Sequence, residues 1–393
     1  MVNREKIVNF LTCKYTIFAV WMVFTIFSII NNQENNYKIF HNVFWHVWDG
    51  KPLYIPYPEE YVDVNLYGPF FSVLIAPFAL LPWRIGLIFW NFSLALLIYL
   101  TIRKSTFSWN QQLLLLWFSV NEFYTAVGSA QFNIAIAALI FLTFYAIEKE
   151  KDVWAALCIV IGTFVKLYGV VGLAFFFFSK HKLKFILYLL IWSAIAFVLP
   201  MALNSPEYII GQYGDWYDAL VAKNVHNLDV SGQNVSLLGM IRVLSGFATY
   251  SDLWIIIPGL ILLALPYLRI SQYKYLHFRY AILASILMFV VLFSTGSESV
   301  TYIIAVLGVC VWYVSMPQHR TKWDIGLMVF VFLITSMSPS DLFPRYIEEI
   351  IIKPYALKAL PVFCVWLKLT YELLTADYSK KDLSPTLPFQ GRE

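Results

Sequence analysis

The chain has 393 residues, of which 60% are hydrophobic and only 13% are charged, and its mean hydropathy is +0.67. This composition excludes an ordinary soluble domain and is typical of a polytopic membrane protein. The net charge of +4 is too small to indicate a nucleic acid partner. The four cysteines fall within apolar segments at no paired spacing, so the pattern predicts neither a disulfide framework nor a zinc site.

Apolar segments recur along the chain at lengths suited to a bilayer. A helix rises about 1.5 Å per residue, so about 20 apolar residues cross a hydrocarbon core roughly 30 Å thick. We therefore predict an all-α bundle of about 12 membrane helices, the first of them retained because it lacks a cleavage site. The predicted helices cover residues 12–31, 84–102, 110–127, 131–147, 153–165, 167–178, 183–203, 253–270, 279–295, 299–315, 323–338 and 355–375.

The apolar segment 153–178 requires a break. As one helix, it would place the lysines that follow it on the opposite side of the membrane from the other basic turns. Two half-spans that meet near Lys166 and Gly169 remove this conflict. Most basic residues then share one face, which the positive-inside rule makes cytoplasmic. We expect a multi-pass protein of the inner (plasma) membrane, with both termini cytoplasmic and its function on the long outer segments 32–83, 204–252 and 339–354.

The first outer loop, residues 32–83, carries two shorter helical patterns. Apolar side chains at helical spacing predict an interfacial helix, and these are Tyr37, Phe40, Phe44, Val47 and Trp48. Residues 69–81 are apolar but too few to span, so they predict a second interfacial or re-entrant helix. At the other end, residues 377–393 are polar and lack periodicity. They predict a disordered cytoplasmic tail after a membrane domain of residues 1–376.

Motifs in and after this loop follow one another in a familiar order. They are Asn36-Tyr37-Lys38-Ile39-Phe40, Trp48-Asp49-Gly50-Lys51-Pro52-Leu53-Tyr54, Tyr67-Gly68-Pro69-Phe70-Phe71, Leu80-Leu81-Pro82, Trp90-Asn91, Gln131-Phe132-Asn133, Lys166, and Gln233-Asn234-Val235-Ser236 with Arg242. In this order the sequence resembles glycosyltransferase family 87 over most of residues 32–300. The resemblance implies a membrane enzyme of the GT-C superfamily that transfers a hexose, such as mannose, from a polyprenyl phosphate to an outer-leaflet lipid or glycan acceptor.

One position departs from the family pattern. Members usually carry an aspartate just after the first span, and the resemblance implies that this acid is the catalytic base. The matching residue here is Asn36, whose amide cannot accept a proton at neutral pH. Either another carboxylate serves as the base, namely Glu34, Glu60 or Asp63, or the chain has lost activity. Glu60 and Asp63 are three residues apart and could share a helical face.

Lys166 is the strongest candidate for holding the departing phosphate. A lysine at membrane depth costs about 2.5–3.5 kcal/mol on insertion scales, so it must face a cavity or an anion. The alternative is a lysine that extends to the lipid headgroups. Arg242 and Arg345 lie near outer helix ends and are weaker candidates, since ordinary headgroup contact also explains them.

Sugar recognition combines aromatic faces with amides and carboxylates. The residues that suit this use are Tyr67, Gln131, Asn133, Gln233, Asn234, Glu298 and Tyr302. Tyrosines also gather at membrane interfaces, and a glutamate also suits a helix N-terminus. No glycine-rich phosphate loop is present, which disfavours a nucleotide sugar. We expect a lipid-linked sugar as co-substrate, membrane lipids as neighbours, no cofactor, and a transfer that requires no divalent metal.

Two other functions fit the same composition. A transporter or flippase for a lipid-linked or anionic solute would show broken helices at matching places in two halves, whereas only the break at Lys166 is evident. A non-catalytic subunit of envelope assembly is the third reading, and Asn36 keeps it open.

Overall fold

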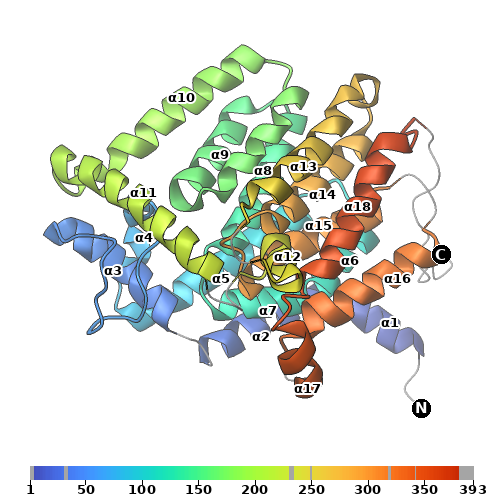
Figure 1. Ribbon diagram of the computed structural model, residues 1–393, viewed down its shortest axis with the longest axis horizontal. Coiled ribbons are helices and arrows are strands. Elements are labelled where there is room, and N and C mark those ends of the chain that lie inside the picture. Colours follow the sequence, from blue (N-terminus) through green and yellow to red (C-terminus); the bar gives the residue numbers. More distant parts are fainter. Residues whose placement is uncertain are drawn as a thin grey trace. The chain divides into compact units, whose positions relative to one another are not determined.

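The computed structural model describes residues 4–30, 34–229, 234–247, 250–316, 320–340 and 342–379, and every regular element within these ranges is a helix (Figure 1). The all-α prediction is therefore confirmed. The chain divides into two compact units. Unit 1 comprises Met1–Trp21, Ile102–Phe123 and Asn227–Glu393, and unit 2 comprises Met22–Thr101 and Tyr124–His226.

Most of the predicted segments contain a helix in the structure, and several helices lie outside them. Unit 2 holds α3 (Asn35–Asp49), α4 (Phe71–Ala79), most of α5 (Trp83–Arg103), α8 (Asn133–Glu148), α9 (Asp152–Lys166), the 3-10 helix η1 (Tyr168–Phe178), α10 (Lys182–Val198), η2 (Leu199–Ala202) and most of α11 (Pro206–Asp229). Unit 1 holds α1 (Arg4–Thr12), α6 (Trp109–Phe118), α12 (Leu237–Ser245), α13 (Leu253–Ala264), η3 (Leu265–Leu268), η4 (Ile270–Gln272), α14 (Leu276–Leu292), η5 (Ser299–Thr301), α15 (Tyr302–Ser315), α16 (Lys322–Phe330), the π-helical η6 (Val331–Met337), α17 (Arg345–Ile347), η7 (Glu348–Ile352) and α18 (Ala359–Thr375). The helices α2 (Lys14–Ile30) and α7 (Val120–Gly128) are shared between the units.

Few of these helices are long enough to cross a membrane by themselves. Two of those described, Trp83–Arg103 and Lys182–Ala202, have the required length and hydropathy. A third candidate joins Glu5–Thr12 to Lys14–Ile30, which meet at an angle of 63°. Other predicted spans are short or interrupted. The segment 110–127, for example, divides at Ser119 into α6 and α7. The bundle of about 12 spans therefore stays a prediction.

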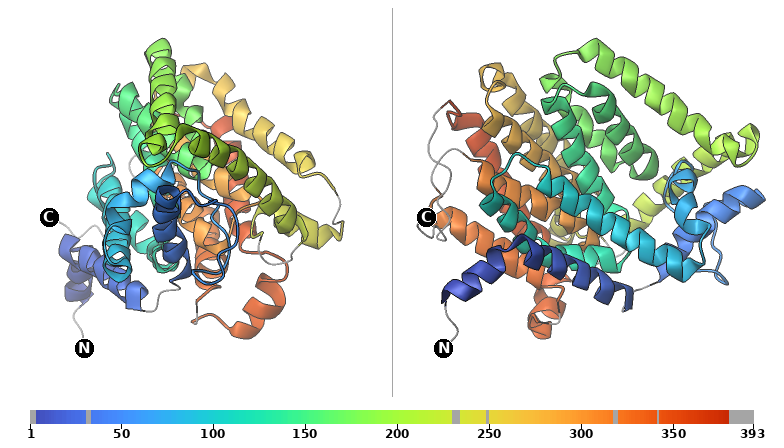
Figure 2. Two further views of the ribbon diagram at one scale, coloured as in Figure 1. Left: turned by 90° about the vertical axis from the view of Figure 1, so that its left-hand side faces the viewer. Right: turned by 180° about the vertical axis from the view of Figure 1, so that it is seen from behind.

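Proline explains where two apolar helices change their winding. Pro200 lies at the start of η2 and Pro266 at the start of η3. A proline has no N–H to donate to the preceding turn, so the α-helical hydrogen bonding ends there and a 3-10 turn follows. Beyond η2 the chain enters α11, a helix within the segment 204–252 that the sequence did not predict (Figure 2).

The predicted break at Lys166 is confirmed. Helix α9 ends at Lys166, Leu167 has φ 12° and ψ −24°, and η1 then runs back along α9. The approach is very close, since a Cβ atom on Gly169 would lie 2.4 Å from the carbonyl carbon of Gly162. Helix α8 packs beside both, and α8 and α9 can be followed side by side in Figure 1. Glycine is needed here because only a residue without Cβ permits this contact.

Both helices predicted within residues 32–83 are present. In α3, the predicted apolar positions are buried except Trp48, which is exposed. The buried face packs against protein, because the ring of Phe40 meets those of Phe71 and Trp90 edge-on at 5.0 and 6.1 Å. The chain between α3 and α4 is not helical. Glu60 and Asp63 therefore do not share a helical face, and the prolines of this segment explain why.

Unit 1 is built around α14, α15 and α18, which pack together. The indole N–H of Trp366 donates to Ser285 Oγ at 3.0 Å across this core. Arg269 donates to the carbonyls of Leu373 and Ala376, which satisfies the C-terminal end of α18. Order continues past the predicted domain end at 376, since Tyr378 is buried. Most of the predicted disordered tail, residues 380–393, lies outside the described residues.

Candidate functional site

Lys166 lies at the C-terminal end of α9 and faces a set of polar and aromatic groups within unit 2. Its Nζ donates to Asn133 Oδ1 at 2.7 Å. The ring centroids of Tyr67 and Tyr168 are 5.9 and 5.2 Å from the same nitrogen. Aromatic faces attract a cation, and an amide oxygen orients it without removing its charge. The ammonium group thus meets one amide oxygen and two aromatic rings at this side of the break.

The amide that holds Lys166 is itself oriented by its neighbours. Asn133 is fully buried at the start of α8, and its Nδ2 donates to Gln131 Oε1 at 2.8 Å. The hydroxyl of Tyr67 accepts from the backbone N–H of Phe132 at 3.4 Å. The predicted residues Lys166, Asn133, Gln131 and Tyr67 therefore come together in the structure, and their gathering defines the candidate site.

Tyr67 reaches this site because its loop is pressed onto the end of α9. The N–H of Gly68 donates to Val165 O at 3.1 Å, and a Cβ on Gly68 would lie 2.2 Å from Phe164 O. Asn65 is buried and fixes the turn, since its side chain accepts from Tyr67 N and donates to Tyr67 O at 3.0 and 3.1 Å. The sequence analysis did not identify Asn65.

Helix α11 braces the same loop from the other side. Gln212 Oε1 accepts from Leu53 N at 2.7 Å, and the indole N–H of Trp216 donates to Leu66 O at 3.0 Å. Both side chains are buried. Because the loop is bonded at both ends, its carboxylates have defined surroundings even though it contains no helix.

Two of the three candidate acids contact nearby basic side chains. Glu34 pairs with Lys38 at 3.2 Å on the exposed surface of α3. Glu60 Oε2 lies 2.8 Å from Nε2 of His46, whose side chain is only 2% exposed. Burial lowers the pKa of His46, although the charge of Glu60 opposes the shift. The imidazole is therefore neutral near pH 7 and donates to Glu60.

Asp63 has different surroundings. It is exposed and has φ 78°, a left-handed conformation that costs energy in any residue with a Cβ. The preceding residue, Val62, is pinned to the start of α3, because both its backbone groups bond the side chain of Asn35 at 2.8 Å. Within the described parts of the chain, the Asp63 carboxylate has no ion pair or hydrogen bond.

Asn36 contacts the segment that precedes Gln131. Its Nδ2 donates to Ser129 O at 2.9 Å, two residues before Gln131. A carboxylate could not make this hydrogen bond, because it has no N–H to donate. The amide at position 36 thus supplies the N–H donor that the backbone carbonyl of Ser129 accepts.

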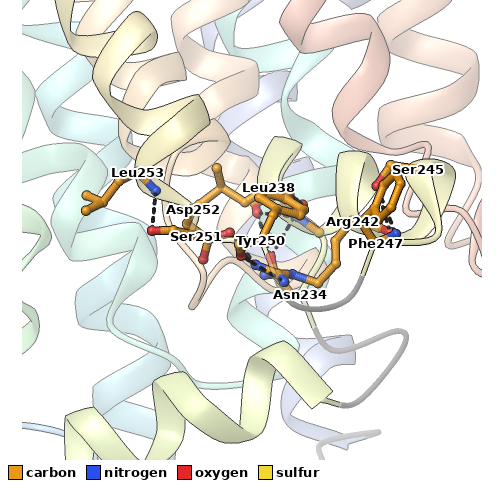
Figure 3. Close-up of polar contacts among 11 residues, drawn as sticks. Asn234, Leu238, Arg242, Ser245, Phe247, Tyr250, Ser251, Asp252 and Leu253 are labelled. Atoms are coloured by element: carbon orange, nitrogen blue, oxygen red, sulfur yellow. Dashed lines mark hydrogen bonds and ion pairs between the residues drawn. The ribbon is translucent and has the colours of Figure 1, made fainter.

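The remaining predicted residues belong to unit 1. Figure 3 shows the Arg242 side chain directed toward Tyr250 and Asp252. Arg242 Nη2 lies 2.5 Å from Asp252 Oδ1, and the guanidinium carbon is 4.4 Å from the Tyr250 ring centroid. The arginine is buried, and Asp252 compensates its charge. Arg345 is exposed at the start of α17, and Gln233 lies outside the described residues.

Three predicted sugar-binding residues lie around one turn of unit 1. Asn234 Oδ1 accepts from Ser236 N and Oγ at 3.2 and 2.5 Å, just before α12. The hydroxyl of Tyr302 donates to Val235 O at 2.6 Å. Glu298 is exposed and precedes η5, where it forms a reciprocal cap with Thr301. These local contacts fit the alternative role of Glu298 as an acid at a helix N-terminus.

No group of three or more histidine, cysteine, aspartate or glutamate side chains that could hold a metal ion occurs in the parts of the chain that the structure describes.

Comparison with known protein families identifies the family of this chain. Residues 65–295, more than half of the sequence, match glycosyltransferase family 87. The chain belongs to glycosyltransferase family 87. No curated protein matches the sequence. The family match includes Tyr67, Gln131, Asn133 and Lys166, whereas Asn36 and all three candidate acids precede it. Membership places the chain among the glycosyltransferases, and its long apolar helices place it with membrane proteins.

Proposed function

We propose that this family 87 member is an integral-membrane enzyme that transfers a hexose from a polyprenyl phosphate to an outer-leaflet lipid or glycan acceptor. The observation that carries the proposal is the gathering of Lys166, Asn133, Gln131 and Tyr67 at the helix break. A lipid-linked donor fits an extracytoplasmic site in a plasma membrane protein, where nucleotide sugars are scarce. The proposed architecture is a GT-C bundle of about 12 spans that buries this site against the bilayer.

Lys166 has the role of holding the phosphate of the donor. Negative charge grows on this phosphate as the bond to the sugar breaks, and a preorganised ammonium group stabilises that charge most where water is scarce. The hydrogen bond from Nζ to Asn133 orients the ammonium group, which carries three N–H donors. In the proposed mechanism, the Lys166 ammonium donates to a phosphate oxygen.

We assign contact with the hexose to Gln131, whose side chain is partly exposed and is bonded by Asn133. Asn133 and Tyr67 are buried, and their role is to orient Gln131 and Lys166. The mannose-like identity of the hexose is part of this proposal. It follows from the family resemblance rather than from any contact in the site.

Asp63 is the carboxylate that best suits the role of base. Glu34 and Glu60 each hold a basic partner, whereas Asp63 is exposed in a strained conformation beside the start of α3, where Asn36 lies. In the transfer, Asp63 takes the proton of the acceptor hydroxyl while that oxygen attacks the anomeric carbon. The bond to the phosphate oxygen breaks in the same displacement, which inverts the anomeric configuration, and the phosphate leaves against Lys166.

The test is transfer of labelled mannose from polyprenyl phosphate mannose to membrane lipid acceptors by the purified protein. We expect Lys166→Ala to abolish transfer without loss of folding, whereas Lys180→Ala should retain it, because Lys180 forms only an exposed pair with Glu150. Asp63→Asn should abolish transfer, and Glu60→Gln should reduce it less. Full turnover by the Lys166 variant would remove this lysine from the mechanism. Uptake of the labelled donor into proteoliposomes, without transfer, would favour a flippase.

A further inference from the structure

An ion pair lies deep within unit 1, and the sequence analysis did not identify either partner. Lys358 Nζ lies 3.0 Å from Oε1 and 3.2 Å from Oε2 of Glu122. The two side chains are 4% and 1% exposed. Glu122 belongs to α7 and Lys358 immediately precedes α18. Two buried charges are costly to desolvate, and ionisable groups in membrane proteins are therefore retained mainly where they have a function.

Lys358 bonds a third segment in addition to Glu122. Its Nζ donates to Ser299 Oγ at 2.9 Å and to Ser299 O at 3.2 Å. The ring of Tyr302 lies beside the same nitrogen at 4.9 Å. A lysine has three N–H donors, and the carboxylate, the hydroxyl and the carbonyl together supply an acceptor for each of them. The ammonium group is thus a junction between α7, η5 and the start of α18.

The turn that Lys358 contacts is also hydrogen-bonded to the segment that precedes α12. The N–H of Val235 donates to Ser297 O at 2.8 Å, and the hydroxyl of Tyr302 donates to Val235 O at 2.6 Å. Glu298 lies within this turn, and Asn234 lies next to Val235. A displacement of the turn therefore moves both residues.

We propose that Lys358 and Glu122 are a positioning pair that fixes the turn 297–302 and thereby places Glu298 and Asn234 for binding the sugar or the acceptor. This inference rests on the proposed function and on the sequence analysis, which names Glu298 and Asn234 as candidate sugar-binding residues. Stability by itself does not call for such a pair, because well-packed apolar side chains often replace a buried ion pair without loss. The two hydrogen bonds to Ser299 are what an apolar pair could not provide.

The decisive variant exchanges the charges, Glu122→Lys with Lys358→Glu. It retains a buried ion pair, so we expect it to fold. A carboxylate at position 358 can accept from Ser299 Oγ but cannot donate to its carbonyl, so the turn loses part of its support. Ser299→Ala is the matched single variant, since it removes one contact and leaves the ion pair intact. The single variant Lys358→Met leaves Glu122 unpaired and is expected to fold poorly.

Two readouts separate positioning from a purely structural role. In both folded variants we expect faster amide hydrogen exchange at Val235 and Thr301. The KM for the acceptor should rise, and kcat/KM should fall on the order of 10- to 100-fold in the exchanged pair, the effect of a displacement of about 1 Å at a reacting site. Wild-type exchange rates and kinetics in the exchanged pair would overturn the proposal. If the wild-type protein shows no transfer, the proposed function fails, and the exchange rates alone decide whether Lys358 holds the turn.

Discussion

The contact between α9 and η1 makes a sharp prediction about a single methyl group. In the Gly169→Ala variant, the new Cβ would lie 2.4–2.5 Å from three backbone atoms of Gly162 and Thr163. Backbone atoms cannot rotate away as a side chain can. The two helices must therefore separate by about 1 Å, and overpacking of this kind costs about 1–3 kcal/mol or more.

A matched control exists in the same unit. Gly211 is exposed in α11, and no atom lies within 4 Å of a Cβ placed there. Gly211→Ala should stabilise the protein by about 0.5–1 kcal/mol, because glycine is the poorer helix former. The same chemical change is thus expected to have opposite signs at the two positions. The measurement is the apparent melting temperature in detergent, which should fall for Gly169→Ala and rise for Gly211→Ala.

The Gly169 variant also tests the site. Separation of α9 from η1 moves the end of α9, where Lys166 contacts Asn133. We expect transfer to be reduced even at temperatures where the variant is folded. If Gly169→Ala melts at the same temperature as the wild-type protein, the close hairpin at the break is incorrect. The placement of Lys166 derived from it is then incorrect as well.

Three further predictions concern other parts of the molecule. Folding lowers the pKa of His46, so the unfolded chain binds the proton more readily. The stability that His46 contributes is therefore present above about pH 6.5 and is lost on acidification, by at most about 1.4 kcal/mol per pH unit. His46→Gln should flatten the acid side of the stability profile measured by thermal melts, and an unchanged profile would refute the assignment. Arg242→Met should cost about 1–3 kcal/mol because the carboxylate of Asp252, which is 13% exposed, loses its partner. The double variant with Asp252→Asn should recover part of this loss in chemical denaturation. Asn36→Asp replaces the donor to the Ser129 carbonyl with a negative oxygen, so it should destabilise the protein by about 1–3 kcal/mol and should not raise transfer activity. Higher transfer activity would instead show that position 36 is the site of the missing base.

Some features of the site were predictable because they depend on local sequence. Long apolar segments indicated helices, and the positive-inside rule predicted a break near Lys166, which the structure contains. The order of short motifs indicated glycosyltransferase family 87, which the match over residues 65–295 confirms. The sequence spacing of Gln131 and Asn133 also placed them together at the start of one helix.

Other features required the tertiary structure, because they join residues that are distant in the chain. Spacing could not reveal that Glu60 would be paired with a buried histidine or that Asp252 would compensate Arg242. A charge within the predicted span 110–127 was a signal for Glu122, but its partner is 236 residues away.

The sequence by itself thus determined an all-helical chain with a lysine at a broken helix, because apolar segments are read along the chain. The order of its motifs, by resemblance, indicated the glycosyltransferase family. The tertiary structure decided which side chains meet that lysine, which carboxylate is left exposed and which buried charges neutralise one another. Those outcomes depend on close packing between segments, and the hydrophobic pattern of a helix specifies which face is buried without specifying its partner.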